Sequence, residues 1–135
     1  LEQLTIDHSV AQMDIRNGVD PKIAFSRVDA FQLTQALGPR NNSFVHPDIS
    51  VMEIKENTLF VLCSDGLCDN NFLENHWQTY LSPLISAQTS LNEGLSKIIA
   101  LGNEVNGHDN ITCVLVRVRI QHRSKYDQEL STVVK

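Results

Sequence analysis

The sequence predicts an α+β fold in which helices cover a largely antiparallel sheet. Two strongly apolar stretches, 58–64 and 110–120, have the composition of strands, and the segments between them repeat apolar residues at helical spacing. The chain has 135 residues, of which 41% are hydrophobic and 20% are charged. This length and composition are typical of one globular domain with a core of its own.

Two short helices are expected before the sheet. Asp7 or Ser9 is the expected N-cap of the first helix, and Gly18 is the residue that should end it. A second helix is predicted over 21–28, because Pro21 suits a first helical turn.

The strands are expected to follow. One is predicted over 30–38, and the runs 49–54 and 58–64, separated by the polar residues 55–57, predict an antiparallel hairpin. The run 58–64 has almost no polar side, so both of its faces should be covered. The alternation within 110–120 predicts the last strand.

Two longer helices are expected between the last two strands. Helical spacing runs from Asn70 until Pro83 ends it, and a second helix runs from Ser90 to a stop at Gly107. Residues 1–120 are thus expected to form the folded portion of a domain. The polar segment 121–135 is expected to be a flexible C-terminal tail.

Composition argues against several classes of partner. The formal net charge is −5, from 11 basic and 16 acidic residues, and no basic stripe suggests nucleic-acid binding. The sequence also lacks an apolar run long enough for a membrane span and a recognisable signal peptide at its start, which favours a cytoplasmic protein. Three cysteines without CxxC spacing are expected to be reduced thiols, with Cys63 and Cys113 buried.

Two carboxylates stand at the ends of the apolar strands. Asp65 follows 58–64, and Asp109 directly precedes 110–120. If these strand ends lie together, both carboxylates could reach one magnesium or manganese ion, because these cations prefer oxygen ligands. An ordinary turn, in which Asp65 caps and Gly66 supplies a positive φ, is the alternative.

Other polar side chains are expected to have ordinary roles. Arg117 and Arg119 alternate with valines, which predicts that both lie on an exposed face of the last strand. His108 precedes Asp109 but is not expected to be a metal ligand. Trp77 and Tyr80 are expected to pack a helix against the sheet.

Four fragments together resemble one protein family. They are LTIDHSVAQ at 4–12, LTQALG at 33–38, FVLCSDGLCD at 60–69 and GHDNIT at 107–112. In this order and spacing they resemble the metal-dependent PPM-type (type 2C) protein serine/threonine phosphatases of the bacterial branch. The resemblance covers most of this chain but only about the C-terminal half of a family catalytic domain.

The resemblance implies a fold, a metal centre and a reaction. The fold would be an α-β-β-α sandwich of two antiparallel sheets, and the centre a binuclear manganese or magnesium site to which Asp65 and Asp109 contribute ligands. Gly66, Asp69 and Asn110 would support the metal loops. Metal-activated water would hydrolyse phosphoserine or phosphothreonine in a phosphoprotein substrate.

The family motifs that this chain lacks set a second expectation. The bridging Asp-Gly motif, another acidic ligand and a Gly-Asp-Ser segment belong to the N-terminal half, so this chain alone is expected to be inactive. The alternative function is a non-catalytic half-domain that acts as an interaction module. It would pair with the missing half or with a second copy, as a homodimer, through exposed sheet edges.

Overall fold

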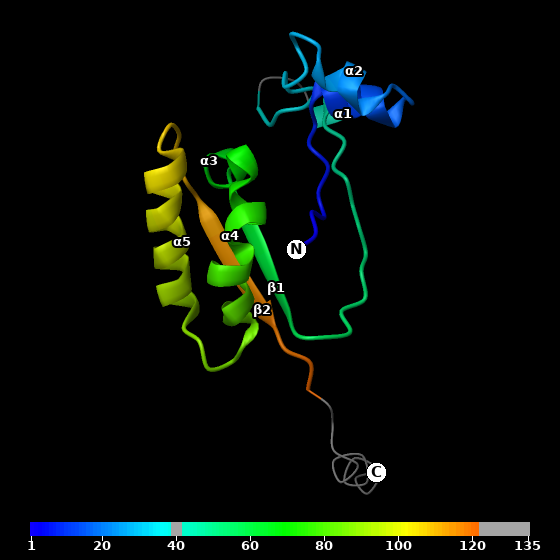
Figure 1. The fold of residues 1–135 in the computed structure, drawn as a ribbon. Coiled ribbons are helices and arrows are strands. Elements are labelled where there is room, and N and C mark those ends of the chain that lie inside the picture. Colours follow the sequence, from blue (N-terminus) through cyan, green and yellow to red (C-terminus); the bar gives the residue numbers. More distant parts are fainter. Residues whose placement is uncertain (39–41, 122–135) are drawn as a thin grey trace, which may run out of the picture. The chain divides into compact units, whose positions relative to one another are not determined.

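A computed structural model describes residues 1–38 and 42–121 of the chain (Figure 1). The chain divides into two compact units, Leu1–Met52 and a second unit that begins at Glu53. None of the helices in the described ranges combines the length and apolar character that crossing a membrane requires. Apart from Gln121, the predicted tail lies outside the described residues.

The first predicted helix forms with the expected signals at both ends. α1, Val10–Arg16, begins after Ser9, whose side-chain oxygen accepts a hydrogen bond from the Gln12 amide at 3.3 Å. Ser9 rather than Asp7 is therefore the N-cap. Beyond the helix Gly18 has a φ of 91°, a left-handed conformation that glycine adopts without a steric penalty.

The second helix is shorter than predicted. α2, Pro21–Phe25, begins after Asp20, whose carboxylate accepts a hydrogen bond from the Lys22 amide. A short 3-10 helix, η1, spans Asn42–Phe44. The core of this unit is small and rests on three fully buried alanines, Ala11, Ala24 and Ala30.

The strand predicted over 30–38 is wrong. A single bridge pairs Leu33 with Ser9, and the rest of the segment is turn or irregular. The carbonyls of Ala30 and Gln32 accept hydrogen bonds from the first amides of α1 instead. Leu33 is 70% exposed, so the apolar residues that suggested a strand cover no sheet face here.

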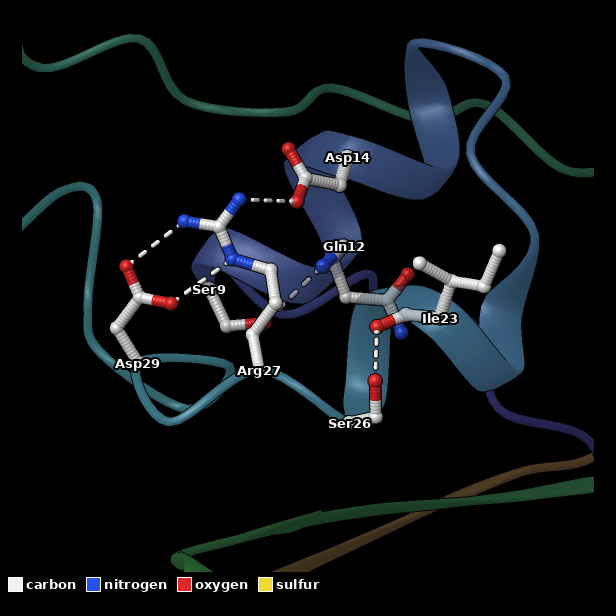
Figure 2. A network of polar contacts seen from close by, with 7 residues as sticks. All are labelled: Ser9, Gln12, Asp14, Ile23, Ser26, Arg27 and Asp29. Atoms are coloured by element: carbon white, nitrogen blue, oxygen red, sulfur yellow. Dashed lines mark hydrogen bonds and ion pairs between the residues drawn. The ribbon is translucent and has the colours of Figure 1, made fainter.

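An arginine ties α1 to the turn that follows α2. Figure 2 shows Arg27 between two carboxylates, 3.1 Å from Asp14 and 2.8 Å from Asp29. The hydrogen bond from Arg27 lowers the pKa of Asp29. The ion pair between Arg27 and Asp29 is solvent-exposed, so its contribution to stability is small.

The second unit is built around a two-stranded antiparallel sheet. β1, Thr58–Cys63, pairs with β2, Cys113–Val118, and the register places Cys63 opposite Cys113. Both strands were predicted, although β2 is shorter than 110–120. Because the two strands are paired, the end of β1 lies beside the start of β2. The two candidate carboxylates stand close to these strand ends in the sequence.

The hairpin predicted between 49–54 and 58–64 is wrong. Residues 49–54 form no strand, and Ile49 and Val51 are almost fully exposed. β1 pairs with β2 instead, because β2 brings an apolar face that shares a core with the helices, whereas 49–54 has no covered face.

Five helical segments connect the two strands. They are α3 (Asp65–Cys68), η2 (Asp69–Asn71), α4 (Phe72–Tyr80), η3 (Ser82–Ile85) and α5 (Leu91–Asn106). α4 and α5 are the two helices that the sequence predicts, and α5 starts at the expected N-cap, Ser90. α3, a single turn, was not predicted. The core contains six buried residues, Leu67, Phe72, Leu81, Leu84, Ile98 and Cys113.

Within this unit the helices cover one face of the sheet (Figure 1). Val61 and Leu115 pack against the helical core. On the opposite face, Leu62 is 56% exposed, Val114 53% and Val116 45%. The prediction that the strand is covered on both faces is therefore wrong for the described part of this unit.

Arg117 does not lie on an exposed strand face, which corrects the sequence prediction. It stands opposite Leu59 on the helix-facing side, and its Nη1 donates to the backbone carbonyls of Leu84 at 3.0 Å and Thr89 at 2.9 Å. A further hydrogen bond reaches the Ser86 carbonyl. The guanidinium thus anchors the segment between η3 and α5 to the sheet.

Candidate metal centre

The end of β1 and the segment before β2 are held together by three hydrogen bonds. The Ser64 amide donates to the Thr112 carbonyl at 3.0 Å, and the Thr112 amide donates to Ser64 Oγ at 3.0 Å. Ser64 Oγ also donates to the Asn110 carbonyl at 3.1 Å. Asp65 and Asp109 therefore lie on two segments that meet at one end of the sheet.

Asp65 is the first residue of α3 rather than the last residue of a strand. Its carboxylate is exposed, and Oδ1 accepts a hydrogen bond from the Gly66 amide at 2.9 Å. The other carboxylate oxygen has no protein partner among the described residues. It is available to a cation.

Glycine is required at position 66 because the backbone of Asn110 approaches it closely, and not because of its backbone φ angle. Its backbone does not adopt the left-handed conformation of the turn considered above. A Cβ at this position would lie 2.4 Å from the carbonyl oxygen of Asn110, which is shorter than any real contact. Glycine thus lets α3 pack directly against the segment that carries Asp109.

Asp109 lies in the turn between α5 and β2. Its side chain is exposed, and Oδ1 accepts a hydrogen bond from the Asn110 amide at 2.7 Å. As at Asp65, the second carboxylate oxygen has no partner in the described part of the chain. Both candidate ligands have the same local arrangement, in which the next amide fixes the carboxylate.

Asp69 contacts the second segment at a different place. Its carboxylate lies 3.3 Å from Nε2 of His108, and its backbone carbonyl accepts a hydrogen bond from the Asn106 side chain at 3.0 Å. These contacts join Asp69 to the second segment, but no bond joins it to Asp65 or Asp109. The involvement of Asn106 was missed.

The chain brings together few metal ligands. Within residues 1–38 and 42–121, no three His, Cys, Asp or Glu side chains converge in a way that could hold an ion. Asp65 and Asp109 supply two oxygen donors, which suits a hard cation that keeps most of its water ligands. A closed site would need further ligands.

The three cysteines do not form such a site. All are free thiols, and Cys113 is buried whereas Cys68 is exposed, with Cys63 between these extremes. Burial raises the pKa of Cys63 to about 12 and also raises the pKa of Cys68 and Cys113. The thiols therefore stay protonated at neutral pH, which disfavours them as ligands.

Comparison with known proteins gives a consistent set of relatives. The chain is 29% identical over 126 residues to the serine/threonine phosphatase stp of Listeria welshimeri, and 31% identical over 117 residues to that of Listeria monocytogenes. It is 32% identical over 114 residues to a Streptococcus pyogenes protein named as protein phosphatase 2C-type. No family model matches the chain, and no solved structure matches it significantly.

The coverage of these matches is unequal. They include 84 to 93% of this chain but only 44 to 47% of each relative, so the chain spans about half the length of the proteins that it resembles. This agrees with the half-domain predicted from the motifs. The chain is therefore similar to type 2C protein serine/threonine phosphatases and aligns with about half of such a protein.

Proposed function

We propose that this chain is the C-terminal part of a metal-dependent phosphoprotein phosphatase that hydrolyses phosphoserine and phosphothreonine. In this proposal Asp65 and Asp109 are ligands of manganese or magnesium, and Gly66, Asp69 and Asn110 support the two metal loops. The observation that carries it is the register of β1 and β2, which joins the segments of both aspartates at one end of the sheet. The motif resemblance and the named relatives support the same function.

The two carboxylates fit a hard cation. Both are exposed, and in each one oxygen is fixed by the following amide while the other is available. When bound, the metal would activate water and neutralise charge on the phosphoryl group. The role of this chain is to hold the two carboxylates at a fixed separation before the metal arrives.

The remaining half of the phosphatase domain is the proposed structural partner. The face formed by Leu62, Val114 and Val116 is apolar and exposed, as expected if a second antiparallel sheet completes an α-β-β-α sandwich there. The missing half would also supply the bridging ligand. We propose a cytoplasmic protein with phosphoprotein substrates and no nucleic-acid or membrane partner.

Manganese binding by this chain tests the proposed ligands. Calorimetry of the full chain should show weak binding, and Asp65→Asn and Asp109→Asn should each weaken it about tenfold or more, because each removes one of only two charged ligands. Glu93→Gln is the matched control, since Glu93 is an exposed carboxylate in the first turn of α5, at the opposite end of that helix from Asp109. Equal affinity in the wild type and both aspartate variants would contradict the proposal.

Catalysis should require more than this chain. With manganese and p-nitrophenyl phosphate, the isolated chain should show no hydrolysis above the buffer rate, because two carboxylates cannot build a binuclear site. The measurement is product absorbance over a long incubation. Turnover that a chelator and Asp65→Asn both abolish would show that the half-domain is itself an enzyme.

The exposed sheet face also favours a second candidate function, that of an interaction module. Isolated chains should self-associate through Leu62, Val114 and Val116, because this contiguous apolar face has no cover in its own unit. Light scattering should show dimers or larger species that Leu62→Lys converts to monomers. Gln88→Lys adds the same single charge at an exposed site outside this face and should have no effect. A wild-type monomer at high concentration would exclude self-association through this face.

A further inference from the structure

Asn106 is a buried polar residue that the proposed metal site does not use directly. It is the last residue of α5 and only 2% exposed. Its Nδ2 donates to the Asp69 carbonyl at 3.0 Å, and its Oδ1 accepts a hydrogen bond from Asn70 Nδ2 at 3.2 Å. Both ends of the amide are thus satisfied, as a buried side chain requires.

These bonds complete a connection between two segments of the chain. Asp69 is the C-cap of α3, so Asn106 holds the end of α3. At the other end Ser64 is bonded to Asn110 and Thr112. The segment 64–70 is therefore fastened to 106–112 at both ends, and Asp65 and Asp109 lie between the two attachments.

The turn beside Asn106 has an unusual backbone. Asn70 and Asn71 have φ angles of 58° and 56°, so two consecutive non-glycine residues are left-handed. Asparagine tolerates this conformation better than most residues, yet it still has a cost that the surroundings must offset. The hydrogen bond from Asn70 to Asn106 helps to stabilise this conformation.

We propose that Asn106 is a positioning residue for the metal site: it fixes α3, and with it Asp65, relative to the segment that carries Asp109. This inference rests on the proposed function for its purpose, but its structural content can be tested without metal. A residue that only adds stability would affect the whole unit evenly. A positioning residue would affect the junction of the two segments most.

Amide hydrogen exchange of the metal-free full chain, followed by NMR, distinguishes these outcomes. In Asn106→Leu, the Ser64 and Thr112 amides should exchange about tenfold faster relative to Phe60 and Val116, which pair in the middle of the sheet. The control Ile98→Val shortens a buried side chain of α5 away from the junction and should change all four amides equally. An equal change at both places in the Asn106 variant would overturn the proposal.

A second variant covers the case in which Asn106→Leu does not fold. Asn70→Gly removes the side-chain donor while favouring the left-handed φ, so the unit should stay folded. It should also speed exchange at Ser64 and Thr112 selectively, and unchanged exchange there would contradict the proposal.

Manganese calorimetry on the same variants separates the two hypotheses. Asn106→Leu, or Asn70→Gly where that fails to fold, should weaken binding about tenfold, the range expected for residues that orient ligands. If the wild type binds no manganese, or if Asp65→Asn leaves the affinity unchanged, the result counts against the proposed function and not against the structural role of Asn106. Faster exchange at the Ser64 and Thr112 amides in the Asn106 variant would then still support Asn106 as the residue that fastens the two segments.

Discussion

Replacing Arg117 by methionine is expected to lower the free energy of unfolding of the second unit by about 3 kcal/mol. Methionine keeps most of the apolar stem but leaves the carbonyls of Leu84, Ser86 and Thr89 without their charged donor. These carbonyls lie in η3 and in the segment that joins it to α5, so the attachment of α5 should weaken. Urea unfolding followed by fluorescence reports on this unit, because Trp77 in α4 is the single tryptophan.

Arg119→Met provides the matched control in the same strand segment. Arg119 is exposed and has no hydrogen-bond partner among the described residues. The same change of side chain there should alter the free energy of unfolding by less than about 0.5 kcal/mol. Equal effects at the two arginines would mean that the three carbonyl contacts contribute nothing.

Gly66→Ala is expected to destabilise the second unit by about 3 kcal/mol and to abolish manganese binding. The new Cβ would lie 2.4 Å from the Asn110 carbonyl oxygen, so α3 must move away from the segment that holds Asp109. This oxygen cannot move easily, because it accepts the hydrogen bond from Ser64 Oγ. Urea unfolding and calorimetry measure the two effects.

Gly102→Ala separates this effect from that of any added methyl group. In α5 a Cβ at Gly102 would meet the side-chain ends of Leu67 at 2.7 Å and Ile111 at 2.9 Å, both of which can rotate. Alanine also gains about 1 kcal/mol of helix propensity over glycine, so the net change should be small. If Gly66→Ala were no more costly than Gly102→Ala, the close approach to Asn110 would not matter.

The helices were predicted well because their signals are local. Ser9 and Ser90 each lie three residues before the amide that their side chains accept from, and Gly18 follows the C-cap residue of α1. Each of these signals can be read from a few neighbouring residues in the sequence. Strand pairing carries no comparable local signal, which explains why β1 was assigned a partner in 49–54 instead of in β2.

The candidate site shows the same contrast between residues with local sequence signals and residues with distant partners. Asp65 and Asp109 could be selected from the sequence because each adjoins an apolar strand, and their role as ligands stays a prediction. Asn106 could not be selected, because its partners Asp69 and Asn70 lie 37 and 36 residues away in the chain. Arg117 was misassigned for the same reason, since its carbonyl partners belong to another part of the unit.

The pairing of β1 with β2 has a consequence for how the second unit folds. The two strands are separated by all of residues 64–112, so the sheet can form only after a long loop has closed. α4 and α5 lie within that loop and rely on local contacts, which form quickly. We therefore expect the helices to collapse first and to bring β2 to β1, so that the site at the junction is among the last parts of the unit to assemble.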